Sequence, residues 1–460
     1  MVSTHTHEKP QQMPVSLGPL AGSLTSASLG LGGLGLVIAL ACAFLSHDAN
    51  PWRRFMFAYV VAFAFVLSFS LGSLFFVLIQ HLTRAGWSVL VRRFPEALAA
   101  NLGWVAVLFL PIAATVMLGR GELYPWAVHH VDSAHHEVVT ANEGGSHAEG
   151  SAVVSNDHAA AAGEEAHDVH AGGEKYHHQH LDELTLKKRA WLNPTAFIVR
   201  WVIFLGLWGA IACWLRRHSV AQDHDKDWHH TVRMETWAGP LTLIFGVTVT
   251  FAAWDLLMSL NPHWYSTMFG VYFFTGSVVA TMSVLILMIL GLRSRGVLPG
   301  VIGVEHQHDL GKLLFAFVFF WGYIAFSQYM LIWYANLPEE TMWFSHRGAA
   351  ERNEWTPLAI VLLFGHFLIP FVCLMSRHVK RCTGSLVFFA GWLVVMHAID
   401  LWWIVMPELG PSFAIGWMEI GLVVGLSGIY FAPVFRRLAS ASLVPTADPR
   451  LPESIAFENI

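Results

Sequence analysis

The sequence predicts an all-α integral membrane protein with ten transmembrane helices. Hydrophobic residues make up 55% of the 460 residues and charged residues only 13%, with a mean hydropathy of +0.50. The apolar residues gather in ten runs, each near the roughly 20 residues that a helix needs to cross a bilayer. The 20 Trp and 32 Phe residues suit the aromatic belts at membrane interfaces. The net charge of −5 is too small to indicate a class of partner, and we expect no nucleic acid.

The chain divides into tails, helices and one long loop. We expect a tail at 1–23, helices within 24–118, a loop at 119–193, helices within 194–259 and 268–434, and a tail at 435–460. The first apolar run, which ends at Leu45, is expected to be a retained helix, because no signal-type cleavage site follows it. The ten expected helices are 24–45, 53–80, 97–118, 194–216, 236–259, 268–292, 312–334, 356–376, 384–406 and 411–434.

Arg and Lys are unevenly distributed between the two sets of loops. Most lie on the side that holds both termini, whereas the short loops of the other side offer only Arg53, Arg54, Arg347 and Arg352. Cytoplasmic loops hold the excess of basic residues. We therefore expect a multi-pass protein of the bacterial inner (cytoplasmic) membrane with both termini in the cytoplasm.

The loop 119–193 then faces the periplasm. Eleven histidines lie between His129 and His180, among Ala, Gly, Glu and Asp. A metal-binding tract is one interpretation, but the irregular spacing and the absence of cysteine favour a solvated insert. The four cysteines of the chain are far apart and form no CxxC or CxxCH spacing. This argues against an iron–sulfur cluster or a covalently attached haem in this chain.

Two carboxylates occupy matching places in the sequence. Asp255 and Asp400 each begin an Asp-Leu-x5-Pro phrase that closes an apolar helix. Related phrases also precede helices four and eight (Trp191-Leu-Asn-Pro194 and Trp355-Thr-Pro357) and lie within helices two and six. Helices 2–5 and 6–9 are therefore predicted to be two parallel-repeat four-helix bundles, flanked by helices 1 and 10. Chance similarity among apolar segments is the alternative.

Six ionisable residues fall in the outer half of the predicted membrane region. A helix rises about 1.5 Å per residue, which places Arg200 roughly 9 Å, His366 roughly 14 Å and Glu419 roughly 12 Å from the outer ends of their helices. Placing an ionisable side chain inside a bilayer costs free energy, so such residues indicate a function unless they are paired. The six are Arg200, Asp255, His366, His397, Asp400 and Glu419.

Three functions fit these residues. They could form a proton path, they could accept protons from a bound quinol, or His366 and His397 could ligate a b-type haem. The structural alternative is a set of buried pairs, such as Arg200 with Asp255 and Asp400 with His366, that hold the helices together.

Three longer phrases resemble a known family. They are Asp309-Leu-Gly-Lys-Leu-Leu-Phe-Ala-Phe, the stretch from Phe326-Ser-Gln-Tyr to Pro-Glu-Glu-Thr341, and the stretch from Met258-Ser-Leu-Asn-Pro to Met-Phe-Gly270. They are similar to the F-type membrane subunit of bacterial alternative complex III, in the polysulfide-reductase membrane-subunit (NrfD-like) superfamily. The resemblance covers about residues 24–434 apart from the His-rich insert.

This resemblance implies ten helices in two bundles and a place in a quinol:electron-acceptor oxidoreductase. The expected partners are a homologous membrane subunit that holds the quinol site, an iron–sulfur subunit, haem c subunits and lipids. Menaquinol or ubiquinol would be used by the complex, while this chain would bind no redox cofactor or metal. Asp255, His366 and Asp400 match positions where the family suggests a proton path.

We therefore expect an accessory rather than catalytic subunit. Asp255 and Asp400 would anchor two proton half-paths, with His366, His397, Glu419 and Arg200 along them. A stand-alone secondary transporter and a structural scaffold for redox subunits are the alternatives.

Overall fold

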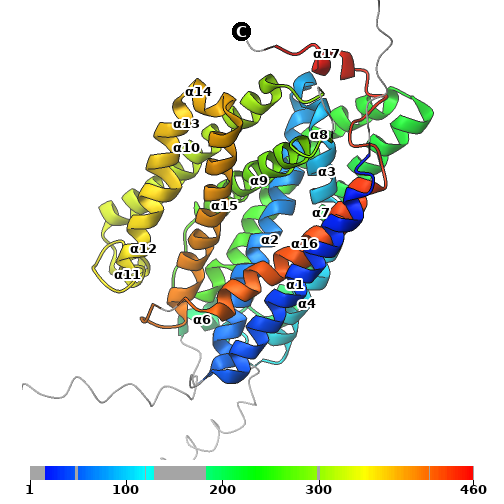
Figure 1. Cartoon of the computed structure of the whole chain (residues 1–460). Coiled ribbons are helices and arrows are strands. Elements are labelled where there is room, and N and C mark those ends of the chain that lie inside the picture. The colour runs from blue at the N-terminus through cyan, green and yellow to red at the C-terminus, as the bar shows by residue number, and fades with distance from the viewer. Residues whose placement is uncertain are drawn as a thin grey trace, which may run out of the picture.

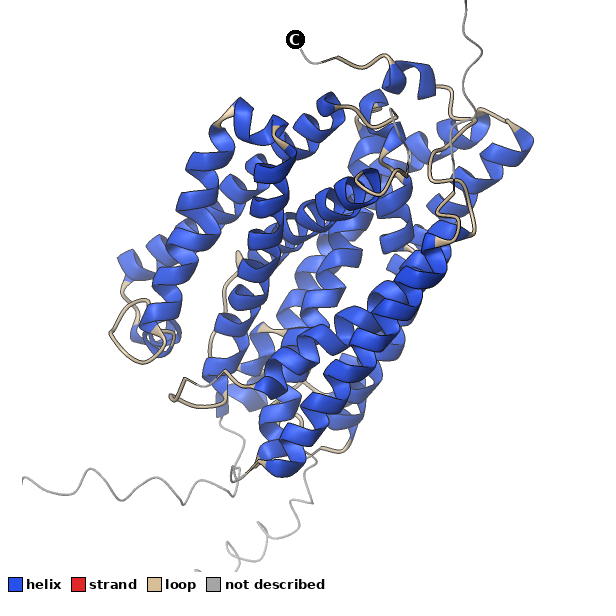
Figure 2. Cartoon of the chain, in the orientation of Figure 1, coloured by secondary structure: helices blue, strands red, loops and turns tan. Residues whose placement is uncertain are grey.

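The computed structural model describes residues 16–46, 50–119, 121–128, 183–297, 301–413 and 415–458. Within these ranges the chain forms helices joined by loops and contains no strand (Figure 2). Most of the predicted His-rich loop, residues 129–182, lies outside the described residues, so the interpretations of that loop stay predictions.

Ten helical segments of the described chain are long and apolar enough to cross a membrane, which confirms the predicted number. They are α1 (Leu20–Leu45), α2 (Pro51–Leu82), α3 with α4 (Arg93–Ala99 and Leu102–Met117), α7 (Pro194–Asp225), α8 with η3 (His229–Leu256 and Met258–Leu260), α9 (Phe269–Arg293), α10 (Val304–Ala335), α12 with η4 and α13 (Thr356–Val361, Leu362–Leu368 and Ile369–Met375), α15 with η5 (Thr383–Val405 and Met406–Glu408) and α16 (Trp417–Ala439). Shorter helices are η1 (Gly86–Leu90), α6 (Glu183–Lys187), α11 (Pro338–His346), α14 (Arg377–Arg381) and α17 (Leu451–Ile455).

Helix ends follow local capping signals. Asn50 and Asn193 accept hydrogen bonds from the backbone N–H of Arg53 and Ala196, and a proline follows each cap at the first helical position. Several helix bounds differ clearly from their predictions: among them, α7 ends at Asp225 rather than at 216, α10 begins at Val304 rather than at 312, and α16 begins at Trp417 rather than at 411.

α1 begins and α16 ends at the same end of the bundle, at the top of Figure 1, where α17 also lies. We call this the terminal end and the opposite end the distal end. An even number of spans brings the chain back to the side where it started, as the ten helices do here.

α2 and α9 form the centre of the bundle and are buried along most of their length. They approach closely at Gly72, where a Cβ atom would lie 2.6 Å from the carbonyl oxygen of Ser277 and 2.3 Å from Thr281 Oγ1. α1 and α16 pack side by side along their length (Figure 1). Their contact is also made of small residues, since a Cβ at Gly35 would lie 2.6 Å from Gly421 O. Close backbone approach through small residues is a common way to pack helices in a membrane.

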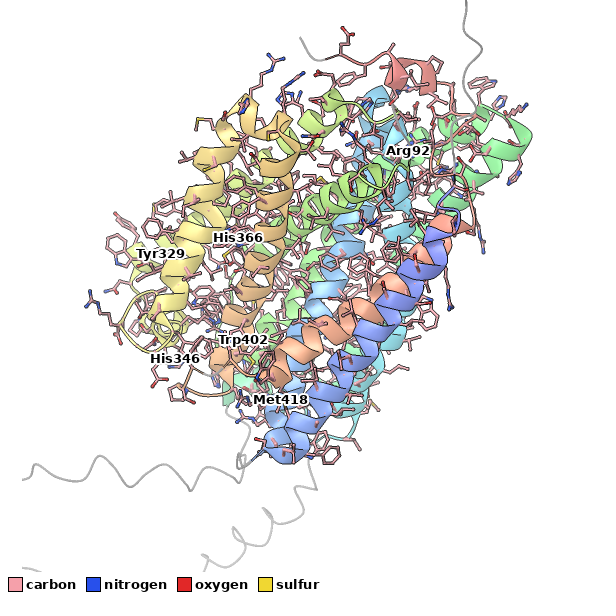
Figure 3. The ribbon with its side chains drawn as sticks, in the orientation of Figure 1. Arg92, Tyr329, His346, His366, Trp402 and Met418 are labelled. Atoms are coloured by element: carbon pink, nitrogen blue, oxygen red, sulfur yellow. The ribbon has the colours of Figure 1, made fainter. Side chains whose placement is uncertain are left out.

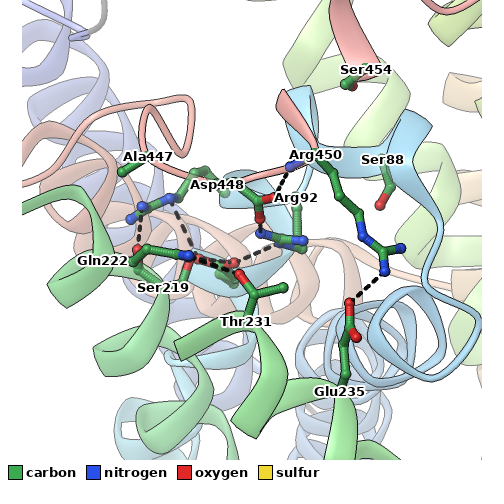
Figure 4. Close-up of polar contacts among 12 residues, drawn as sticks. Ser88, Arg92, Ser219, Gln222, Thr231, Glu235, Ala447, Asp448, Arg450 and Ser454 are labelled. Carbon is green, nitrogen blue, oxygen red and sulfur yellow. Dashed lines mark hydrogen bonds and ion pairs between the residues drawn. The ribbon is translucent and has the colours of Figure 1, made fainter. Parts of the chain in front are cut away.

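The C-terminal segment 443–455 folds back over the terminal end. Asp448 pairs with the buried Arg92 at the start of α3, and Arg450 pairs with Glu235 of α8 at 2.9 Å (Figure 4). Ser454 Oγ, which is buried, accepts a hydrogen bond from Leu90 N–H. The part of the predicted tail that packs here, residues 443–455, is therefore an ordered part of the fold.

Candidate functional site

Asp255 lies in the last turn of α8, near the distal end, and is 0% exposed. Arg200 of α7 binds its carboxylate with two hydrogen bonds, Nε to Oδ2 at 2.6 Å and Nη2 to Oδ1 at 3.0 Å. The indole N–H of Trp191 donates to Oδ1 at 2.9 Å, and the Arg200 guanidinium lies 4.1 Å from the Trp191 ring centre. The expected Arg200–Asp255 pair is confirmed.

Loop residues cover Asp255 from the distal side. The hydroxyl of Tyr124 donates to Leu256 O at 2.8 Å, and Trp126 Nε1 donates to Ser259 O at 3.0 Å. Burial raises the pKa of the Tyr124 phenol well above its usual value, and the neighbouring Asp255 carboxylate adds to that shift. Tyr124 is therefore a neutral donor at this site.

Asp400 lies one helical turn before the end of α15 and is 2% exposed. The phenol of Tyr272 on α9 donates to Oδ1, and the indole N–H of Trp321 on α10 donates to Oδ2 at 3.3 Å. No cationic side chain forms an ion pair with Asp400 in the described part of the chain. Asp255 and Asp400 therefore differ in kind: Asp255 is bound by a guanidinium, whereas Asp400 is bound by two neutral donors.

His366 lies close to Asp400 but does not bond to it. Its ring stacks on the ring of Trp321, with centroids 3.9 Å apart. The side chain is 0% exposed, and neither ring nitrogen has a hydrogen-bond partner among the described residues. The buried Asp400–His366 pair of the structural alternative does not form, because Trp321 contacts both groups: it donates to Asp400 and stacks on His366.

A π-helical stretch, η4, surrounds His366. Extra-residue turns of this kind are rare and are frequently found at functional sites. Figure 3 shows His366 between the level of Arg92 at the terminal end and that of His346 at the distal end. His366 is thus a buried, unpartnered imidazole well inside the bundle.

His397 faces the central helices one turn before Asp400. Its Nε2 lies 3.0 Å from Ser68 Oγ on α2, and Ser277 Oγ on α9 donates to the same oxygen at 3.1 Å. A Cβ atom at Gly276 would lie 3.1 Å from His397 Cε1, so the glycine allows the imidazole to reach the centre of the bundle. His397 Nδ1 has no partner among the described residues.

Arg347 lies on the distal side of the Asp400 region. It is 1% exposed, pairs with Glu408 at 2.7 Å, and donates to Ile404 O at 2.6 Å. Its guanidinium also lies 3.6 Å from the Trp343 ring centre. Burial lowers the pKa of Arg347, and the adjacent Glu408 carboxylate opposes that shift.

Glu419 lies at a helix end. Since α16 begins at Trp417, the expected depth of roughly 12 Å is wrong. Its carboxylate accepts from Gly416 N–H at 2.7 Å and pairs with Arg54 at 2.6 Å. An acidic side chain in the first turn also interacts favourably with the helix dipole. Glu419 therefore caps α16 and ties it to the start of α2.

The structure thus brings five of the six predicted residues into two groups: Arg200 with Asp255, and His366, His397 and Asp400. Sequence reasoning missed the groups that hold Asp400, Tyr272 and Trp321, and the buried Arg347. Tyr272 and Trp321 stand among many aromatic residues in apolar helices, where no spacing distinguishes them. Arg347 lies in a loop of the distal side in the predicted topology, and nothing in the spacing of that loop indicates that it is buried.

No protein-family model and no curated protein matches this sequence.

Proposed function

We propose that this chain is an integral membrane subunit of a quinol-oxidising electron-transfer complex of the alternative complex III type. In this proposal the chain contains no redox centre and provides proton-conducting half-paths coupled to quinol oxidation. It would work beside a homologous quinol-site subunit, an iron–sulfur subunit and haem c subunits, in the bacterial inner membrane with both termini cytoplasmic. The family resemblance supports the complex, and the buried polar groups support the role in proton transfer.

The observation on which the proton role rests is the environment of Asp400. An intramembrane carboxylate costs several kcal/mol unless it is paired, hydrated or protonated. Asp400 faces Tyr272 and Trp321, which are neutral donors, so it can gain or lose a proton without breaking an ion pair. His366 stacks on the ring of the same Trp321 whose indole N–H donates to Asp400, and both of its ring nitrogens lack a hydrogen-bond partner among the described residues.

We assign the half-path of the second repeat to Asp400, His366 and His397, and that of the first repeat to Asp255. Support for two repeats comes from α2 and α9, which hold Phe69-Ser-Leu-Gly72-Ser73 and Phe273-Phe-Thr-Gly276-Ser277 and pack against each other. The ion pair with Arg200 favours a second candidate role for Asp255 alone, as a tie between α7 and α8. A haem between the histidines would compete with the His397–Ser68 hydrogen bond.

The first experiment is mild detergent purification by a C-terminal tag, followed by an optical spectrum and identification of co-purifying chains. Haem c and iron–sulfur subunits should accompany the chain, and the dissociated chain should be colourless. Purification of the chain alone would support the transporter alternative. A haem spectrum in the isolated chain would assign His366 and His397 as ligands instead.

The proton role is tested with Asp400→Asn and Asp255→Asn in the assembled complex. We expect Asp400→Asn to lower the number of protons moved per electron while quinol oxidation continues. Glu351→Gln, an exposed carboxylate at the distal end, is the matched control. An unchanged proton-to-electron ratio in the double variant D255N/D400N would contradict the proposal.

A further inference from the structure

A long groove runs along the outside of the bundle between α4 and α7. It has a volume of about 1290 Å³, which exceeds the roughly 300–1,000 Å³ of small-molecule pockets. Its middle is lined by small residues, including Gly103, Ala106, Gly206 and Gly209. A Cβ atom at any of these three glycines would meet no other atom within 4 Å. The middle of the groove is therefore apolar, and the side chains of this protein do not fill it.

The terminal end of this groove is basic. Arg217 of α7 and Arg437 of α16 line it, and neither forms an ion pair with a carboxylate in the described part of the chain. Arg437 donates to the neutral amide oxygen of Asn101, while Arg216 donates to Arg437 O at 2.7 Å and adds a third positive charge. The indoles of Trp214 and Trp237 lie beside these arginines.

We propose that this groove binds an anionic phospholipid. The phosphate would lie between Arg217 and Arg437, and an acyl chain would lie along the groove past Gly206 and Gly209. Guanidinium groups match phosphate geometry, and basic pockets between transmembrane helices on the cytoplasmic side bind anionic headgroups. Indole rings beside the arginines suit the level of the headgroups.

The charge pattern favours a lipid over a helix of another subunit. A helix packed on the glycines would leave Arg217 and Arg437 without a carboxylate partner unless it also brought acidic residues to that depth. A phospholipid supplies both parts in one molecule, an anion at the level of the arginines and hydrocarbon along the groove. The proposal is independent of the role of the chain in quinol oxidation.

Native mass spectrometry of the purified protein, titrated with phosphatidylglycerol or phosphatidylcholine, tests the site. We expect preferential binding of phosphatidylglycerol, and about tenfold weaker binding in R217Q/R437Q. The control R233Q/R377Q removes two exposed arginines from the same end and should bind as the wild type does. Equal loss in both double variants would show only a general effect of net charge and would overturn the proposal.

A second pair of variants tests the apolar part. Gly206→Phe places a ring in the groove, whereas Gly246→Phe places one on the exposed face of α8, where a Cβ also meets nothing within 4 Å. Only Gly206→Phe should displace the lipid, and thermal unfolding should show that both variants fold. Undiminished binding in Gly206→Phe would mean that the arginines attract a headgroup at the surface alone. Occupation of the groove by a partner helix, detected by cross-linking from the Gly209→Cys variant, would also contradict the proposal.

Discussion

Arg200 binds Asp255 through two hydrogen bonds of 2.6 and 3.0 Å within the distal half of the bundle. The pair joins α7 to α8, two helices whose apolar stretches are mostly exposed on the surface of the chain. A bidentate pair of this kind fixes both position and orientation of the helices. Asp400, which begins the matching Asp-Leu-x5-Pro phrase of the sequence, has no such counter-charge among the described residues.

Removing Arg200 should destabilise the protein more than removing Asp255. Arg200→Gln leaves a fully buried carboxylate without its cation, which costs about 3 kcal/mol. Asp255→Asn keeps a polar side chain that can accept from Trp191, and we expect about 1–2 kcal/mol. Thermal unfolding in detergent measures both. The double variant R200Q/D255N should be more stable than the sum of the two losses implies, and simple additivity would show that the pair does not act as a unit.

Tyr272→Phe should affect function more than stability. It removes one of the two donors to Asp400, which costs about 1–2 kcal/mol in the free energy of unfolding. If protons pass through Asp400, the proton-to-electron ratio of the complex should also fall. Tyr59→Phe is a suitable control, because the Tyr59 hydroxyl donates only to Leu108 O, at 2.8 Å. Equal effects of the two variants on the ratio would remove Tyr272 from the path.

His366→Phe should leave the fold intact. The imidazole has no hydrogen-bond partner among the described residues, and a phenyl ring can keep the stacking on Trp321, so the cost should be below about 1.5 kcal/mol. Proton transfer should nevertheless slow, because phenylalanine cannot bind a proton. A variant with normal proton coupling would show that His366 only fills space.

Asp448→Asn should loosen the C-terminal segment 443–455. It breaks the buried pair with Arg92, although Arg92 keeps Glu96 at 3.3 Å, and we expect a loss of about 2 kcal/mol. Hydrogen–deuterium exchange in residues 443–455 should rise. Arg450→Gln, which removes a more exposed ion pair, should cost below about 1 kcal/mol and serves as the comparison. Identical exchange in the two variants would mean that Asp448 does not hold the segment.

Much of the fold could be predicted because the length and apolar composition of membrane helices distinguish them in a sequence. The ten spans and the Arg200–Asp255 pair follow from that pattern and from the cost of an unpaired charge. The start of α16 was missed because residues 411–416 are as apolar as the helix that follows, while Gly416 and Glu419 form its cap. The order of the C-terminal segment was missed as well, since it depends on Arg92, far away in the chain. The cluster around Asp400 depends on which faces α9, α10 and α15 turn to one another, and periodicity in uniformly apolar helices does not show this.

The glycine contact between α1 and α16 bears on how the protein is made. The first and the last of the ten spans are each other's main neighbours, and a Cβ at Gly428 would lie 2.5 Å from the backbone nitrogen of Gly32. During synthesis α1 must enter the bilayer long before its partner exists. Until nearly the whole chain has been synthesised, the face of α1 that holds these small residues must contact lipid or an insertion factor instead of α16. Packing of α16 against α1 is therefore a late step of folding. A chain arrested before α16 is made would expose the small-residue face of α1, which membrane quality-control proteases could recognise.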